Sequence, residues 1–175
     1  IVPDTDRESG VGHINRCLAL AGSIERQGAK PILFLPQNTM ALEAFSRFSH
    51  IVFDDLIAVA KKAKAKKIIF DGYGLPTQWS LKCSQKGHIV IAIDDTGLPE
   101  LPLDLIINPN AHAKTEMYEN SKLLLGTKYA LLRNEIVEIK QKKKTTTSQQ
   151  RILVCMGGAD PKGATLTVID ALSAV

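Results

Sequence analysis

The sequence predicts an α/β protein of the Rossmann-like class, with a doubly wound parallel sheet. Short, continuous apolar runs alternate with amphipathic helical patterns, and polar residues follow most of the apolar runs. Runs of this kind are typical of parallel strands that helices cover on both faces. A glycine-rich turn precedes the first helical pattern, and a second such turn recurs about 145 residues later. We therefore predict two Rossmann-like domains that face each other across a cleft.

The first helical pattern begins after Gly10 and ends at Gly28. Its apolar face consists of Ile14, Cys17, Leu18, Ala21 and Ile24, which recur at helical spacing. Gly28 supplies the stop. Strands are then expected at 32–35, 51–53, 68–70, 89–93 and 105–107, and a further apolar run follows at 123–125. Helices are expected at 37–48, 56–66 and 77–86, and a further one after residue 133 that ends near 141.

The domain organisation follows from a change in composition near the C-terminal end. Residues 1–141 form the predicted N-terminal Rossmann-like domain, and 142–150, which are rich in Lys, Thr, Ser and Gln, form a linker. Residues 151–175 are expected to begin a C-terminal nucleotide-binding domain. They contain a strand at 152–155, a glycine-rich turn at 157–160 and a helix from residue 164. The chain opens without a Met and ends inside this helix, so we interpret it as a fragment with a truncated second domain.

The composition excludes several classes of protein. Apolar residues make up 45% of the 175 residues, which is ordinary for a globular domain and argues against disorder. No apolar run is long enough to span a membrane, and no signal peptide is visible. Cys17, Cys83 and Cys155 are far apart in apolar contexts, which indicates reduced core residues. We expect a cytoplasmic protein.

The positive charge is local. The formal net charge is +4, but nine lysines lie in two runs, at 61–67 and 140–144. The rest of the chain has 13 basic residues against 18 acidic ones. Neither run contains Arg or an aromatic residue, which recognition of bases would favour. We interpret the first run as a solvated helix end and the second as part of the linker, and we expect no nucleic-acid partner.

The first glycine-rich turn has the features of an anion site. Gly10 and Gly12 allow a ligand to approach the backbone, and the following helix start offers unpaired N–H groups and the positive end of a dipole. Phosphate or diphosphate suits such a site. His13 follows directly, where the positive field favours a neutral imidazole that accepts a proton. The alternative is that His13 is only a capping or surface residue.

Polar residues follow the predicted strands at the edge where ligands bind in doubly wound sheets. These residues are Asp71, Tyr73, Asp94, Asp95, Asn108 and Asn110. Turn formation and helix capping explain part of this pattern. Mg²⁺ binding by the two adjacent aspartates is a further alternative, but a hydrogen-bonding role at a strand end is favoured. The four histidines lack metal-ligand spacing, so we expect no metal.

Two nucleotide-binding classes are disfavoured. A nicotinamide dehydrogenase would have a third glycine in the first turn, where Asn15 stands, and an acidic residue after the next strand, where Gln37 stands. A P-loop nucleotidase would have a Gly-Lys-Ser/Thr turn, which is missing from the sequence. We expect no cofactor.

A series of motifs resembles one family. The Gly-x-Gly-His-x-x-Arg-x-Leu-x-Leu-Ala pattern at 10–21 is similar to the signature of PseG/SpsG-type UDP-sugar hydrolases, which belong to the pseudaminic-acid pathway and to spore-coat polysaccharide synthesis. Further similarities follow in the same order: Asp-Gly-Tyr-Gly at 71–74, Asp-Asp at 94–95, Asn-Pro-Asn-Ala at 108–111 with Tyr118 after it, Gly-Thr-Lys-Tyr-Ala-Leu-Leu-Arg at 126–133, and Gly-Gly-Ala-Asp at 157–160. The resemblance covers nearly the whole chain.

The resemblance implies a glycosyltransferase-B-like fold of two domains and hydrolysis of a UDP-linked diacetamido-trideoxy sugar. The products would be UDP and a free sugar on the way to a nonulosonic acid. In the family, water attacks the anomeric carbon with inversion and without a metal. The family's catalytic His falls on His13, and its active-site Tyr falls on Tyr73. The residues we expect to bind the substrate are Gly10, Gly12, Arg16, Asp71, Asp95, Asn108, Asn110, Gly157, Gly158 and Asp160.

The chemistry of the residues agrees with this function and leaves alternatives open. UDP leaves readily once N–H groups and a helix dipole hold its charge, so the remaining need is a base for the water. Arg16 either adds charge at the diphosphate or forms a surface salt bridge. Tyr73 either orients sugar or water or is a wall of the cleft. Two rival functions remain: a glycosyltransferase on the same fold, and a non-catalytic module that binds a UDP-sugar.

Overall fold

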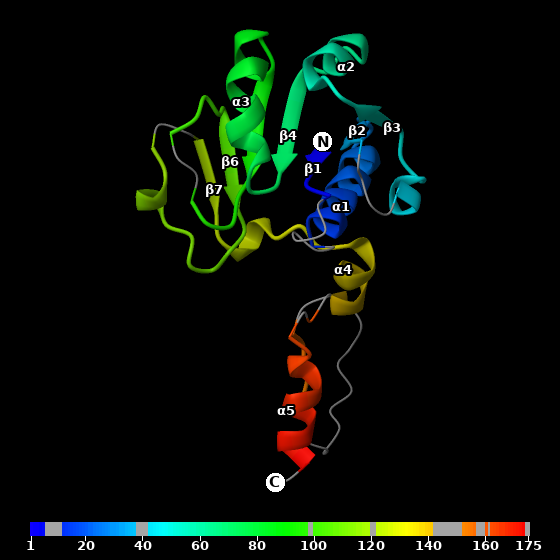
Figure 1. The fold of residues 1–175 in the computed structure, drawn as a ribbon, viewed down its shortest axis with the longest axis vertical. Coiled ribbons are helices and arrows are strands. Elements are labelled where there is room, and N and C mark those ends of the chain that lie inside the picture. Colours follow the sequence, from blue (N-terminus) through cyan, green and yellow to red (C-terminus); the bar gives the residue numbers. More distant parts are fainter. Residues whose placement is uncertain are drawn as a thin grey trace.

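A computed structural model describes residues 1–5, 12–37, 42–97, 100–119, 122–141, 152–156, 160 and 162–173. It contains seven strands and five α-helices among these residues (Figure 1). The strands are β1 (Val2–Pro3), β2 (Leu33–Pro36), β3 (His50–Phe53), β4 (Lys67–Asp71), β5 (Ile89–Ile93), β6 (Leu105–Asn108) and β7 (Lys122–Leu125). The α-helices are α1 (Gly12–Arg26), α2 (Leu56–Lys62), α3 (Leu75–Gln85), α4 (Asn134–Gln141) and α5 (Ala164–Ser173). Short 3-10 helices are η1 (Leu42–Phe45), η2 (Thr115–Met117) and η3 (Thr127–Tyr129).

All strand pairs are parallel, and their order is that of a doubly wound sheet. Five strands pair in the order β1-β4-β5-β6-β7, and β2 pairs with β3 in a separate two-stranded sheet. The amide of Phe34 on β2 donates a 2.8 Å hydrogen bond to the carbonyl of Ile1, beside β1. Across the molecule the order is therefore β3-β2-β1-β4-β5-β6-β7. The chain first adds β2 and β3 on one side of β1 and then adds β4 to β7 on its other side. The predicted Rossmann-like α/β fold is confirmed, and its topological switch point lies between β1 and β4.

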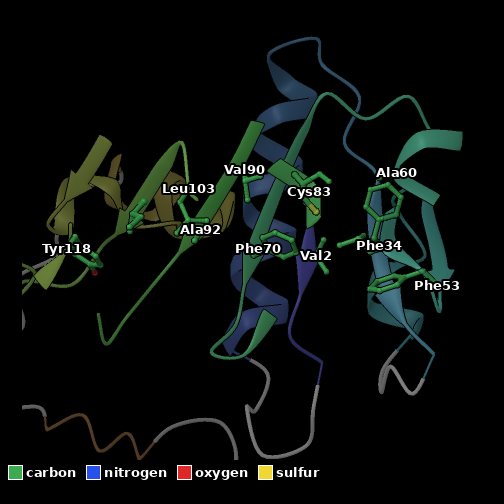
Figure 2. Close-up of a cluster of buried hydrophobic side chains, with 13 residues drawn as sticks. Val2, Phe34, Phe53, Ala60, Phe70, Cys83, Val90, Ala92, Leu103 and Tyr118 are labelled. Carbon is green, nitrogen blue, oxygen red and sulfur yellow. The ribbon is translucent and has the colours of Figure 1, made fainter. Parts of the chain in front are cut away.

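Each face of the sheet has its own hydrophobic cluster. On one face, Phe70 of β4 packs with Ala60 of α2 and Cys83 of α3. Figure 2 shows this cluster as a band of side chains that extends across the strands from Phe53 to Tyr118. On the other face, Cys17 and other apolar residues of α1 pack against β2. Because successive strand residues point to opposite faces, the continuous apolar runs serve both clusters.

Two helix ends illustrate how local chemistry sets the boundaries. The carboxylate of Asp55 caps the start of α2, since it accepts hydrogen bonds from the amides of Ile57 (2.9 Å) and Ala58 (3.3 Å). α2 ends at Lys62, before the predicted end at 66, because Lys64 takes a left-handed conformation with φ 52°. α3 ends where Gly87, with φ 78°, supports the turn that the sequence predicted.

The structure corrects two predicted elements. In place of a helix over 37–48, the described residues form only the 3-10 turn η1; Phe45 at its end and Phe48, three residues later, are both buried. This spacing suits the three-residue period of a 3-10 helix. The strand predicted at 152–155 is also wrong, because Ile152 and Leu153 are 71% and 90% exposed and no described strand pairs with them. A strand needs a partner for its backbone groups.

Other predictions at the C-terminal end have mixed outcomes. The predicted helices that end near 141 and begin at 164 are observed as α4 and α5. α5 has no buried residue. The linker at 142–150 lies outside the described residues, and the division into two domains stays a prediction.

Candidate active site

Residues from α1 and from the ends of β4, β5 and β6 meet at the topological switch point. His13 and Arg16 lie in the first turns of α1. Asp71 is the last residue of β4, Asp95 follows β5, and Asn110 follows β6. Hydrogen bonds join all five side chains. The sequence predicted polar residues at this edge of the sheet, and the structure brings these together.

Asp71 is the centre of this group. Its side chain is completely buried. One carboxylate oxygen, Oδ1, accepts from His13 Nδ1 at 2.7 Å and from Arg16 Nη2 at 2.5 Å. The other, Oδ2, accepts from Arg16 Nε at 2.9 Å and from the Cys17 thiol at 3.4 Å. Asp71 thus accepts hydrogen bonds from four donors and has no exposed surface. Its predicted contact with the substrate stays a prediction.

These contacts fix the tautomer of His13. A carboxylate only accepts hydrogen bonds, so the 2.7 Å contact with Asp71 requires the proton on Nδ1. Arg16 Nη2 lies 3.0 Å from the same nitrogen, but a protonated Nδ1 has no lone pair for it. In the neutral ring, Nε2 therefore carries the free lone pair. This is the arrangement that a general base of the His-Asp type requires.

Arg16 holds two carboxylates at once. While Nε and Nη2 donate to Asp71, Nη1 lies 2.9 Å from each carboxylate oxygen of Asp95. Burial lowers the pKa of Arg16, but hydrogen bonds to both aspartates outweigh this and raise the pKa above its ordinary value. The arginine forms a largely buried ion-pair network, with 16% of its side chain exposed. Its predicted contact with a diphosphate stays a prediction.

Asp95 and two asparagines continue the network toward β6. The side chain of Asn110 donates to Asp95 Oδ1 at 2.9 Å and to Asn108 Oδ1 at 3.0 Å. Asn108 Oδ1 also accepts from the Asn110 amide at 3.0 Å. Burial raises the pKa of Asp95, but the hydrogen bonds from Arg16 and Asn110 lower it by more, so the net shift is downward. Asp95 is therefore a carboxylate whose ionised form is stabilised by its neighbours.

Tyr73 provides the exposed part of the group. Its side chain is 54% exposed, whereas that of His13 is nearly buried at 5%. The two rings meet edge to face, with centroids 5.1 Å apart and an interplanar angle of 89°. Such pairs are favourable in themselves. Tyr73 thus packs on the imidazole and presents its other side to solvent.

The position between Asp71 and Tyr73 requires a glycine, Gly72. A Cβ atom at Gly72 would lie 2.4 Å from the Cβ atom of Asp4, far inside the range of real contacts. The amide of Asp4 also donates to the Asp71 carbonyl at 2.7 Å, which holds the ends of β1 and β4 together. At Gly74, by contrast, an added Cβ meets no atom within 4 Å. The close approach at Gly72 therefore sets where the chain turns after Asp71.

The remaining predicted site residues have other positions. Gly12 is the first residue of α1, and an added Cβ there would meet open space. Asp160 accepts hydrogen bonds from the amides of Ala164 (2.9 Å) and Thr165 (3.0 Å), so its described contacts are with the start of α5. Gly10, Gly157 and Gly158 lie outside the described residues.

The structure brings into this network three residues that were not among the predicted catalytic or substrate-binding residues, namely Cys17, Asp94 and Tyr118. Cys17 was expected to be a core residue, but its position four residues after His13 is a signal that the two share a helix face. Asp94 accepts from the amide of Gly97 at 2.7 Å and from the Tyr118 hydroxyl at 2.6 Å, which agrees with the hydrogen-bonding role favoured for it. No pattern in the sequence indicates that Tyr118 reaches this aspartate.

The described residues form neither a metal-ligand cluster nor a membrane-spanning helix. In this part of the chain, no three His, Cys, Asp or Glu side chains gather where they would ligate a metal. Nor does any helix in the described ranges combine the length and apolar character needed to cross a membrane.

Comparison with known proteins identifies relatives of this chain. No protein-family model matches it. Over 97% of its length, the chain is 26% identical to the UDP-2,4-diacetamido-2,4,6-trideoxy-beta-L-altropyranose hydrolase of Campylobacter jejuni. The resemblance to PseG is confirmed. The chain is also 24% identical, over 98% of its length, to an uncharacterized protein of Methanocaldococcus jannaschii. It spans 63% of the hydrolase and 39% of the archaeal protein.

Proposed function

We propose that the protein hydrolyses a UDP-linked diacetamido-trideoxy sugar to UDP and the free sugar, with His13 as the general base. The likeness to the Campylobacter hydrolase supports the substrate class. The observation that carries the proposal is the 2.7 Å contact between His13 Nδ1 and the buried Asp71. It supports a base because it leaves the Nε2 lone pair for a water molecule.

The proposed reaction is a single displacement at the anomeric carbon. His13 Nε2 takes a proton from water while the water oxygen bonds to the anomeric carbon. The bond from that carbon to the β-phosphate oxygen breaks, and its electron pair leaves with UDP. Attack from the face opposite the leaving group inverts the anomeric configuration. The carboxylate of Asp71 stabilises the imidazolium that forms, as in His-Asp pairs generally.

Two further residues have proposed roles at the sugar. Tyr73 is the half-exposed neighbour of His13, so its hydroxyl is suited to orient the sugar or the attacking water. Arg16 is held by two aspartates, which supports a role in fixing Asp71 more than a free diphosphate contact. Diphosphate binding is instead proposed for the glycine-rich turns around Gly10 and Gly157.

The wider setting is also proposed from the resemblance. The free sugar would enter the biosynthesis of a pseudaminic-type nonulosonic acid, and the protein would act in the cytoplasm. A glycosyltransferase-B-like second domain would hold the uridine. Neither a metal nor a cofactor is expected to take part.

The test is to follow the full-length protein with a UDP-diacetamido-trideoxyhexose by phosphorus and proton NMR. We expect UDP and free sugar to appear without an acceptor, the first-formed sugar having the inverted anomeric configuration. His13→Gln should lower the rate by at least about 10²-fold, the size of a general-base contribution. The matched control is His112→Gln, because His112 is exposed and lies outside the network.

Each contrary result favours a rival function. If UDP is released only when a sugar acceptor is added, the protein is a glycosyltransferase. If the nucleotide sugar binds but survives intact, the protein is a non-catalytic binding module. If hydrolysis proceeds but His13→Gln retains the wild-type rate, His13 is not the base.

A further inference from the structure

Tyr118 lies at the far end of the hydrogen-bond network and does not contact His13. It follows η2, between β6 and β7, and its side chain is 8% exposed. Its hydroxyl lies 2.6 Å from Asp94 Oδ2 and 2.6 Å from Asn108 Nδ2. Asp94 and Asn108 are buried as well, with 5% and 0% exposure. Buried polar groups of this kind need defined partners.

Donor and acceptor chemistry fixes the direction of each bond. Asp94 Oδ2 is a carboxylate oxygen that also accepts from the Gly97 amide, so the Tyr118 hydroxyl must donate to it. The hydroxyl oxygen is then left with its lone pairs. It accepts from Asn108, which must present its NH₂ group rather than its carbonyl oxygen. The orientation of one amide is thereby determined by one phenol.

The orientation of the Asn108 amide decides whether Asn110 meets a hydrogen-bond acceptor or a donor. With Nδ2 turned to Tyr118, Oδ1 faces Asn110 and accepts from both its amide and its side chain at 3.0 Å. Asn110 Nδ2 also donates to Asp95 Oδ1, which holds Arg16 Nη1 at 2.9 Å. A flipped Asn108 would direct an NH₂ group at the N–H groups of Asn110. The bond from Asn110 to Asp95 would then lose its support.

We propose that Tyr118 is a positioning residue, which sets the orientation of Asn108 and through Asn110 and Asp95 holds Arg16 in place beside Asp71 and His13. It does not touch the substrate. The effect on turnover rests on the proposed hydrolase function, but the positioning of Arg16 does not.

The electrostatics of the phenol agree with this role. Burial raises the pKa of Tyr118, and its hydrogen bond to Asp94 raises it further. The hydroxyl therefore keeps its proton at neutral pH and stays a donor to Asp94. A tyrosinate at this position could only accept hydrogen bonds, so its bond to Asp94 would be lost.

The first test uses the wild-type full-length protein, so that no variant needs to fold. In a proton NMR spectrum with nitrogen-15 labelling, the Asn108 NH₂ protons should show contacts with the Tyr118 ring. The Arg16 Nε–H should exchange slowly with water. Contacts of the Asn108 NH₂ with Asn110 but not with Tyr118 would mean a flipped amide and would overturn the proposal.

The second test compares two substitutions. Tyr118→Phe removes only the hydroxyl, and we expect about a tenfold fall in kcat with KM within about twofold, together with faster exchange of the Arg16 Nε–H. The matched control is Tyr129→Phe on η3, outside the network. We expect it to change neither readout.

The outcomes separate this proposal from the proposed function. If the wild type does not hydrolyse the substrate, the hydrolase function fails, and the Arg16 exchange rate still decides the role of Tyr118. Unchanged exchange and turnover in a folded Tyr118→Phe variant would overturn the positioning role. A rise in KM alone would indicate that Tyr118 contacts the substrate, which would also overturn it.

Discussion

Replacing Asp71 by Asn changes one atom of the site and tests the central argument. The amide keeps the shape of the carboxylate but turns one acceptor into an NH₂ donor. If the NH₂ group takes the place of Oδ1, it faces His13 Nδ1 and Arg16 Nη2. If it takes the place of Oδ2, it faces Arg16 Nε and the Cys17 thiol. Either orientation places donors against donors in a completely buried position.

The magnitude follows from what is lost. Arg16 loses the completely buried one of its two carboxylate partners, and breaking a buried ion pair costs about 3–5 kcal/mol. Because 16% of the arginine side chain is still exposed, we take the lower limit of about 3 kcal/mol. For a protein of this size, this corresponds to a fall in Tm of about 6–12 °C. Turnover should fall by up to about 10⁴-fold, because the His13 tautomer is no longer fixed.

The assay combines a urea titration with the NMR hydrolysis rate, each measured on the wild type, Asp71→Asn and Asp55→Asn. Asp55 is the control, because Asn caps a helix as well as Asp does and stability should stay within about 0.5 kcal/mol. A folded Asp71→Asn variant with wild-type turnover would refute the claim that Asp71 sets the tautomer. A wild-type unfolding free energy would refute the claim that its four donors depend on the carboxylate.

Three other predictions concern stability and reactivity. Gly72→Ala should lower the free energy of unfolding by about 1–3 kcal/mol in a urea titration, because of the 2.4 Å contact described above, whereas Gly74→Ala should change it by less than about 1 kcal/mol. The folded-state pKa of Asp95 is lowered, so its ionised form stabilises the fold above the unfolded pKa of about 3.9. This contribution is lost as the pH falls below that value and through the lowered folded-state pKa, so the urea midpoints of the wild type and Asp95→Asn should converge as the pH falls below about 3.9; a constant difference would contradict this. Burial raises the pKa of Cys83 to about 11, so iodoacetamide at pH 8 should label the exposed Cys155 first and Cys83 only on unfolding, as mass spectrometry would record.

The sequence was informative where one residue type decides the local structure. Short apolar runs predicted five of the seven described strands, β2 to β6, within a residue or two, because a strand buried on both faces needs such a run. The polar residues after these runs correctly indicated the edge where Asp71, Asp95 and Asn110 lie. The strand at 152–155 failed because an apolar run becomes a strand only when a neighbour pairs with it.

The roles within the site were harder to predict, because they depend on contacts between distant segments. The spacing of His13 and Arg16 indicates that they share a face of α1, but not that both reach Asp71, 55 or more residues later. An aspartate after a strand is equally compatible with a ligand, a cap or a buried ion-pair partner. Only the packing of α1 against β4 distinguishes these three, and the sequence does not encode that packing as a local pattern.

The four donors on Asp71 have a consequence for how this protein can change during evolution. Three of them come from His13 and Arg16, the fourth comes from Cys17, and all lie within two turns of one helix. The same carboxylate therefore fastens α1 to the centre of the sheet and orients the proposed base. A substitution that adjusts the chemistry also loosens the scaffold, so each has to be compensated elsewhere before it is tolerated. New activities on this framework should arise from the exposed Tyr73 side of the site, where a side chain can be exchanged without breaking the hydrogen bonds between α1 and Asp71.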